Sequence, residues 1–198
     1  MSAPRIVLAS GSPRRHHLLN LIGIAHEVVP ADIDESVRPR ESPRRHAERL
    51  AREKASAVSG RDSGVVAIGA DTIVLIDKKI LGKPANAVDA GSMLNLLNGR
   101  EHTVVTAVAV ARGRKVFSGV EEVSVKFRKL TDDEIDAYIA TGEPMDKAGS
   151  YGIQGYGATI VERIEGDYFA VMGLPLVRLV SLLAEAGVRY GFGNLSTK

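Results

Sequence analysis

Apolar and polar residues follow one another along this chain with the periods of strands and helices. A period-free, β-branched run at residues 65–76 is typical of a strand buried on both faces. Valine-rich, partly alternating stretches predict a hairpin of two strands, at residues 101–111 and 116–127. Shorter apolar stretches predict strands at residues 6–8 and 26–29. Apolar residues at helical spacing predict helices at residues 13–22, 42–59, 86–98, 132–141 and 175–186.

The C-terminal part of the chain is expected to close the fold. Residues 159–164 and 168–171 read as two short strands of a hairpin that turns at residues 165–167. The helix at 175–186 carries a continuous apolar stripe and belongs to the core. Residues 188–198 are expected to form a frayed tail.

Length, charge and cysteine content narrow the class of protein. A chain of 198 residues is one large domain or two small lobes. The formal charge of +2 gives no strong attraction to nucleic acid or to a membrane. The absence of cysteine excludes disulfides, thiolate catalysis and cysteine-based zinc sites. With no signal peptide and no long apolar run, we expect a soluble cytoplasmic protein without a membrane segment.

The segment at residues 9–15 concentrates groups that bind phosphate. It combines the hydroxyls of Ser10 and Ser12, free backbone N–H groups and the guanidiniums of Arg14 and Arg15. Ser12 is expected to cap a helix that begins at Pro13. A helix N-terminus beside two arginines suits a polyphosphate. The alternative is an ordinary capped turn with a solvated arginine pair.

Two charged residues fall among apolar ones. Lys54 lies on the apolar face of the helix at 42–59, so it extends to solvent, pairs with a carboxylate or meets a bound phosphate. Asp71 interrupts the apolar run at 65–76, and a buried carboxylate is costly unless it is paired, metal-bound or catalytic. The alternative for Asp71 is a turn between two strands, although residues 77–79 make a better turn.

Further polar candidates lie in loops. Among the acidic residues of segment 30–40, Glu35 is either a solvated loop carboxylate or a ligand for Mg²⁺. Lys83 is either a solvated loop lysine or a second phosphate contact. The glycine-rich loop at 146–157 carries Gln154, whose amide can read a base edge, unless the loop is simply flexible. His102 is expected to be a structural or a surface residue and not a ligand.

Several of these segments together carry a family resemblance. The chain resembles the Maf family of nucleoside triphosphate pyrophosphatases, first described as septum-formation inhibitors. The matching motifs occur in the family's order and span nearly the whole chain. They comprise residues 8–15, 50–55, 69–72, 82–84, 146–149, 152–155 and 171–175.

The resemblance implies a fold and a reaction. The expected fold is a single Maf-like domain over residues 1–198, a two-lobed α/β fold around a long mixed sheet. It is similar to the inosine triphosphate pyrophosphatases, with a cleft between the lobes. The implied reaction is hydrolysis of the α–β phosphate bond, which gives a nucleoside monophosphate and pyrophosphate. The sequence Gly-Ile-Gln-Gly at 152–155 resembles the branch that prefers dTTP and UTP.

The resemblance also implies a role for each matching residue. Asp71 accepts a proton from the attacking water or binds the metal, and both roles remain open. Glu35 is a metal-side carboxylate for Mg²⁺ or Mn²⁺. The residues expected to hold the triphosphate are Ser10, Arg14, Arg15, Lys54 and Lys83. The residues expected to select the base are Arg14, Thr72 and Gln154. Family members often form homodimers, and no nucleic acid is expected as a partner.

Three alternatives stay open at this point. The same chemistry can act on 7-methyl-GTP. The chain can be a non-catalytic partner in cell division, as the family's older description suggests. It can also bind nucleic acid through the arginines of residues 44–52, although glutamates dilute their charge.

Overall fold

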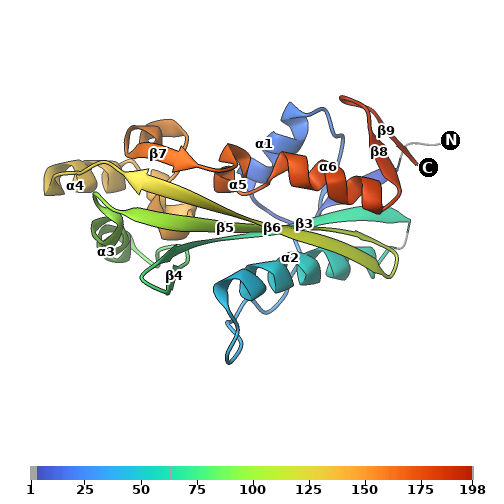
Figure 1. Ribbon diagram of the computed structural model, residues 1–198, viewed down its shortest axis with the longest axis horizontal. Helices are drawn as coiled ribbons and strands as arrows, with labels where there is room; N and C mark the ends of the chain where they lie inside the picture. Colours follow the sequence, from blue (N-terminus) through green and yellow to red (C-terminus); the bar gives the residue numbers. More distant parts are fainter. Residues whose placement is uncertain (1–3, 63, 198) are drawn as a thin grey trace. The chain divides into compact units, whose positions relative to one another are not determined.

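The computed structural model describes residues 4–62 and 64–197. Strands and helices are interspersed along the chain (Figure 1). The strands are β1 (Arg5–Leu8), β2 (Glu27–Val28), β3 (Val65–Ile76), β4 (Lys79–Leu81), β5 (Glu101–Arg112), β6 (Lys115–Phe127), β7 (Val161–Glu165), β8 (Val188–Tyr190) and β9 (Leu195–Thr197). The α-helices are α1 (Pro13–Leu21), α2 (Pro43–Ser59), α3 (Ala87–Leu97), α4 (Asp132–Ala140), α5 (Tyr168–Met172) and α6 (Leu176–Glu185). Short 3₁₀ helices follow α4 at η1 (Glu143–Asp146), η2 (Ala148–Ser150) and η3 (Gly155–Thr159).

Most of the strands form one mixed sheet. Its order is β2-β1-β3-β5-β6-β7, with β4 paired to β3 as the seventh strand. β1 pairs in parallel with β2 and β3, whereas the β3–β4 and β6–β7 pairs are antiparallel. The predicted α/β fold with a long mixed sheet is confirmed.

The chain divides into two compact units. The first holds residues 1–71, 106–121 and 173–198, and the second holds residues 72–105 and 122–172. In the first unit, α2 covers one face of the sheet while α1 and α6 cover the other (Figure 1). Its core includes Leu8, Leu18, Leu50, Ile68 and Leu179, which are at most 2% exposed.

The second unit has a core of its own. Aliphatic residues from β3, β5, β6, α3 and α4 pack together there, and Phe127 is fully buried among them. The rings of His102 and Tyr151 meet Phe127 edge to face, at centroid distances of 4.9 and 4.6 Å. The Nε2 atom of His102 lies 2.8 Å from the hydroxyl of Tyr151. His102 is therefore a structural residue, as expected.

The long strand β3 spans residues 65–76, as expected, and excludes one of the two interpretations of Asp71. The strand continues through Asp71 without a turn, so the alternative of a turn at this position is wrong. The hairpin turn comes at Asp77 and Lys78, whose φ angles are 48° and 66°. Positive φ at both central residues is the geometry of a two-residue hairpin.

Two expectations for the C-terminal part are wrong. Residues 168–172 form the helix α5 instead of a strand, because the side chain and carbonyl of Asp167 accept hydrogen bonds from its first backbone amides. Residues 188–197 form the antiparallel pair β8–β9 instead of a frayed tail. Val188 is fully buried, and the Tyr190 hydroxyl donates to the carbonyl of Ile22 at 2.9 Å.

The start of α1 differs in one detail. Ser12 occupies the N-cap position before Pro13, but its side chain makes no capping hydrogen bond. Its backbone N–H instead donates to the hydroxyl of Ser10, at 3.3 Å. Across residues 4–62 and 64–197, no helix has the length and apolar character needed to cross a membrane.

Candidate active site

The loop between β1 and α1 brings a serine and an arginine together. The Nη1 atom of Arg15 donates to the hydroxyl of Ser10 at 2.9 Å, and Nε donates to the carbonyl of Gly173 at 2.8 Å. These bonds hold the guanidinium at the N-terminus of α1, beside the half-buried Arg14. Burial lowers the pKa of Arg15, Asp71 opposes that shift, and Arg14 adds to it. The predicted phosphate-binding residues Ser10, Arg14 and Arg15 therefore lie together.

Lys54 joins two of the predicted site carboxylates. Its Nζ atom lies 2.8 Å from Oδ1 of Asp71 and 2.8 Å from Oε1 of Glu35. Lys54 and Asp71 are both only 7% exposed, whereas Glu35 reaches in from the surface. Of the three possibilities for Lys54, pairing with protein carboxylates is the one found. An ammonium between two carboxylates offsets the cost of burying these charges.

A glycine allows this pairing. A Cβ atom at Gly69 would lie 2.2 Å from the carbonyl oxygen of Ala51 and 2.6 Å from the amide nitrogen of Ala55. The α2 backbone therefore rests directly on β3 at Gly69. Asp71 follows Gly69 by two residues and points to the same face of the strand, while Lys54 lies between Ala51 and Ala55 in sequence. Close packing at Gly69 thus places Lys54 over Asp71.

The segment that carries Glu35 is fastened to the same helix. Arg49 of α2 donates to both carboxylate oxygens of Glu41, at 2.6 and 2.9 Å, and to the carbonyl of Ser36 at 2.9 Å. His46 adds a contact of 3.1 Å to Glu41. The hydrogen bonds from Arg49 hold the pKa of Glu41 far below its usual range. Glu41 and Arg49 could not be predicted from the sequence, because no local pattern indicates that a carboxylate and an arginine eight positions apart will pair.

The carboxylates of this cluster fit a divalent cation. Asp71 and Glu35 each place an oxygen 2.8 Å from the same ammonium. Mg²⁺ is usually held by one or two carboxylates together with substrate phosphates and water. Within the described ranges, no group of three or more histidine, cysteine, aspartate or glutamate side chains could hold a metal by itself. The donor set therefore suits an ion that arrives with a phosphorylated substrate.

The remaining predicted residues belong to the second unit. Thr72 follows Asp71 on β3 and is half-buried. Lys83 and Gln154 are exposed, on the link after β4 and just before η3. The carbonyl of Gly82 accepts a hydrogen bond from the amide of Gly149 at 3.0 Å, which ties the Lys83 segment to the glycine-rich loop. The predicted cleft between lobes stays a prediction.

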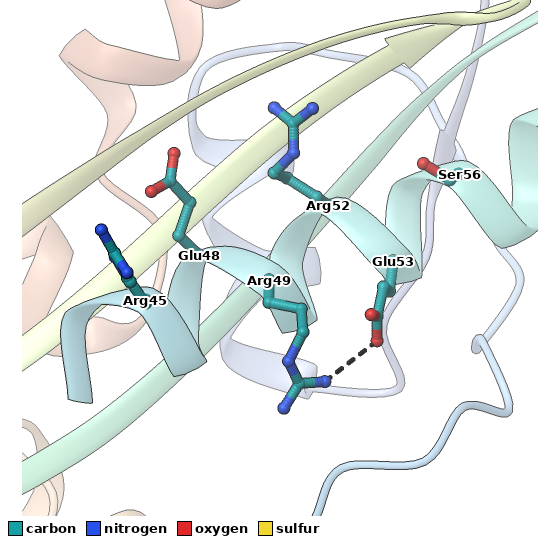
Figure 2. A pocket seen from close by; sticks show the side chains of 6 residues that line it. All are labelled: Arg45, Glu48, Arg49, Arg52, Glu53 and Ser56. Atoms are coloured by element: carbon teal, nitrogen blue, oxygen red, sulfur yellow. Dashed lines mark hydrogen bonds and ion pairs between the residues drawn. The ribbon is translucent and has the colours of Figure 1, made fainter. Parts of the chain in front are cut away.

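A separate shallow pocket lies along α2. Figure 2 shows its lining, which consists of Arg45, Glu48, Arg49, Arg52, Glu53 and Ser56. Two of the arginines here, Arg49 and Arg52, make contacts within the protein. Arg49 pairs with Glu53 at 3.1 Å, and Arg52 donates to the hydroxyl of Ser118 at 2.9 Å. The lining of this pocket does not include Lys54, Asp71 or Glu35.

Known proteins with similar sequences cover nearly the whole chain. A family model described as Maf-like protein matches residues 5–186. A dTTP/UTP pyrophosphatase from Aquifex aeolicus is 49% identical over 94% of this chain and 98% of its own. A dTTP/UTP pyrophosphatase from Bacillus thuringiensis is 47% identical over 93% of this chain and 96% of its own. Among solved structures, the Staphylococcus aureus Ham1 protein aligns with a TM-score of 0.49 and 16% identity over 79% of each chain.

Proposed function

Since the chain belongs to the Maf family, we propose that it is a nucleoside triphosphate pyrophosphatase that hydrolyses dTTP and UTP. The observation that carries the proposal is the contact of Lys54 with Asp71 and Glu35. In this cluster Asp71 supplies a buried carboxylate, Lys54 a buried cation and Glu35 a second carboxylate. Both carboxylates are close enough to Arg15 to oppose the lowering of its pKa by burial. The products are the nucleoside monophosphate and pyrophosphate.

Binding of the triphosphate relies on the basic residues. The N-terminus of α1 offers backbone N–H groups and a positive dipole end, and Arg14 and Arg15 add forked donors. Lys54 and Lys83 supply further positive charge for a substrate with about four negative charges. Because phosphoryl transfer depends mainly on positioning and charge stabilisation, such a clamp provides much of the catalysis.

Asp71 is the proposed proton acceptor. A water molecule attacks the α-phosphorus, the bond to the bridging oxygen breaks and pyrophosphate leaves with that oxygen. The carboxylate of Asp71 takes the proton that the water loses. Its ion pair with Lys54 holds the carboxylate in one orientation.

Glu35 and Asp71 would hold a divalent cation, Mg²⁺ or Mn²⁺. Such an ion, when bound, neutralises phosphate charge and acidifies bound water. Lys54 pairs with both carboxylates in the structure and leaves them one negative charge in excess, so a cation that joins them competes with the ammonium.

Three residues are proposed to select the base. Gln154 is exposed and offers one donor group and one acceptor group for a pyrimidine edge. Thr72 and Arg14 are proposed to complete the selection. The names of the two relatives, both dTTP/UTP pyrophosphatases, support a pyrimidine substrate.

Pyrophosphate release from a panel of nucleoside triphosphates tests the proposal. We expect release to be led by dTTP and UTP, to need Mg²⁺ or Mn²⁺ and to stop with a chelator. Release led by 7-methyl-GTP would keep the chemistry and overturn the pyrimidine preference. No release from any nucleotide would overturn the enzymatic proposal.

Location and assembly complete the proposal. Its substrates belong to the nucleotide pool, so we propose that the protein works in the cytoplasm. We also propose a homodimer, by resemblance to the family. Light scattering coupled to size exclusion measures the mass, and a value near the 21.1 kDa of one chain would contradict the dimer.

A further inference from the structure

A carboxylate outside the predicted site holds the loop that carries Gln154. Glu143, the first residue of η1, accepts a hydrogen bond from the amide of Tyr156 at 2.8 Å on one oxygen. Its other oxygen accepts from the amide of Gly157 at 2.9 Å and from the hydroxyl of Tyr138 at 2.9 Å. One side chain therefore binds two consecutive amides of the loop.

Tyr138 holds the opposite end of the same loop. Its hydroxyl accepts a hydrogen bond from the amide of Gly152 at 3.1 Å while it donates to Glu143. Tyr138 lies on α4, is 6% exposed and packs in the core of the second unit. Burial raises the pKa of Tyr138, so the hydroxyl keeps its proton and remains a donor. The loop is thereby tied to a rigid helix.

The glycines of this loop make room for the carboxylate. A Cβ atom at Gly155 would lie 2.5 Å from Oε2 of Glu143, and the φ angle of Gly155 is +65°. A Cβ atom at Gly157 would lie 2.2 Å from the carbonyl oxygen of Gly152 and 2.7 Å from the hydroxyl of Tyr138. These glycines serve close packing, so the alternative of a loop that is simply flexible does not fit the contacts.

Gln154 lies between the two anchored ends. Gly152 precedes it by two residues, and Tyr156 follows it by two. The Gln154 backbone is extended, with φ −118° and ψ 172°, and its side chain is exposed. The ends are fixed by Tyr138 and Glu143, so these residues determine where the Gln154 amide is presented.

We propose that Glu143 and Tyr138 are positioning residues that set base selectivity through Gln154. The inference rests on the proposed function, because it assigns Gln154 to the base. A carboxylate is needed at position 143 because both oxygens accept from donors. A glutamine there would turn an NH₂ group toward one of these donors and would release one side of the loop.

The substitutions Glu143→Gln and Tyr138→Phe test the inference. The readout is the ratio of kcat/KM for dTTP to kcat/KM for dCTP, with kcat and KM measured separately. Misplacing a substrate-positioning group by about 1 Å can lower the rate about 100-fold. We therefore expect the dTTP to dCTP ratio to fall about 10- to 100-fold. The fall should appear mainly as a raised KM for dTTP, because the phosphate clamp is unchanged.

Glu134→Gln is the matched control. Glu134 also lies in the second unit, where it closes the capping box of α4 and pairs with Arg128 at 2.9 Å. Its loss weakens the same helix without touching the glycine-rich loop, so the dTTP to dCTP ratio should stay within about twofold. Hydrogen exchange provides a readout that needs no turnover. The amides of Gly152, Tyr156 and Gly157 should exchange faster in Glu143→Gln than in the parent chain.

The outcomes separate this inference from the proposed function. A parent chain that releases no pyrophosphate overturns the proposed function. An active and selective parent whose ratio is unchanged by both Glu143→Gln and Tyr138→Phe overturns the inference. An equal fall in the Glu134→Gln control also overturns it, because the effect would then follow from weakening of α4.

Discussion

At the scale of single residues, Asp71 is a strand residue whose chemistry is set by its neighbours. It lies in the middle of β3, and the ammonium of Lys54 reaches it at 2.8 Å. Burial alone would disfavour its charge, and the ion pair offsets that cost. A carboxylate held in one orientation in this way is placed to take a proton.

The substitution Asp71→Asn tests this role. An amide of the same shape cannot accept the proton, so turnover of dTTP should fall about 10²- to 10⁴-fold. Nucleotide binding should persist, because the basic residues of the clamp are intact. Single-turnover assays measure the first effect and calorimetry of binding measures the second. Asp136→Asn, at an exposed position of α4, is the control and should retain activity. Undiminished turnover in Asp71→Asn would contradict the proposed role.

His102 gives a pH dependence to stability. Burial lowers the pKa of His102 to about 4, from an ordinary value of 6.5. The unfolded chain therefore binds one more proton than the folded chain between these pH values, and stability falls as the pH drops through this window. The contribution is about 3 kcal/mol, lost progressively from pH 6.5 to pH 4.

Chemical denaturation from pH 7 to pH 4.5 measures this dependence. In His102→Gln the free energy of unfolding should decline less steeply over that window, because the neutral amide does not titrate. The variant should also be less stable at pH 7, since it loses the ring contacts with Phe127 and Tyr151. Parallel declines in the two proteins would exclude His102 as the titrating group.

At the scale of elements, the contact of α2 with β3 places the proposed catalytic cluster of Lys54, Asp71 and Glu35. The helix lies on the strand at Gly69, and the Arg49–Glu41 pair fastens the segment of Glu35 to the same helix. One helix thus positions both Lys54 and Glu35 against Asp71.

The substitution Gly69→Ala should separate these two elements. The added Cβ atom would meet backbone atoms of α2, which cannot rotate away, so the helix must move. We expect a loss of about 1–3 kcal/mol in the free energy of unfolding. Turnover should also fall, by about tenfold or more, because Lys54 leaves its position over Asp71.

Gly91→Ala is the matched control for this prediction. Gly91 lies in α3, and a Cβ atom there would meet Ile139 at an ordinary 3.5 Å. The helix should gain up to about 1 kcal/mol from the exchange, with activity unchanged. Thermal and denaturant unfolding report both changes. Equal effects of the two substitutions would contradict the proposed packing at Gly69.

At the scale of the whole molecule, the two units share strands. The chain passes from one unit to the other after Asp71, Val105, Glu121 and Met172. The first three of these positions lie inside β3, β5 and β6. No linker separates the units at these crossings, so melting of one unit disturbs strands that continue into the other.

We therefore expect one cooperative unfolding transition. Scanning calorimetry should give equal calorimetric and van't Hoff enthalpies. Circular dichroism at far- and near-ultraviolet wavelengths should report the same midpoint. Two resolved transitions would contradict this expectation and would assign each unit its own stability.

Many element boundaries could be predicted because their signals are local. The capping box of Thr131 and Glu134 forms as its spacing indicates, and α2 begins at Pro43 after a capping serine. The hairpin turn at Asp77 and Lys78 was likewise readable from adjacent residues. Helix α5 was not, because a continuous apolar run of only five residues has no period that distinguishes a helix from a strand.

The residues of the candidate site likewise fall into those that the sequence could predict and those that it could not. The resemblance indicated Asp71, Lys54, Glu35, Ser10 and Arg15, and the structure brings Asp71 and Glu35 together on the ammonium of Lys54. The anchors of the site could not be predicted, because each joins positions whose spacing carries no recognisable pattern. These anchors include the pair of Arg49 with Glu41 and the hydrogen bonds of Glu143 to the glycine-rich loop.

The sequence by itself determined the family, the order of most elements and the set of candidate residues, because motifs, periodicity and caps are properties of neighbouring positions. Only the tertiary structure decided that Lys54 pairs with carboxylates, that β3 runs unbroken through Asp71 and that residues 188–197 form a hairpin. The physical reason is that burial and ion pairing depend on which distant segments meet. In this chain, close contacts such as the one that Gly69 permits between β3 and α2 decide where they meet.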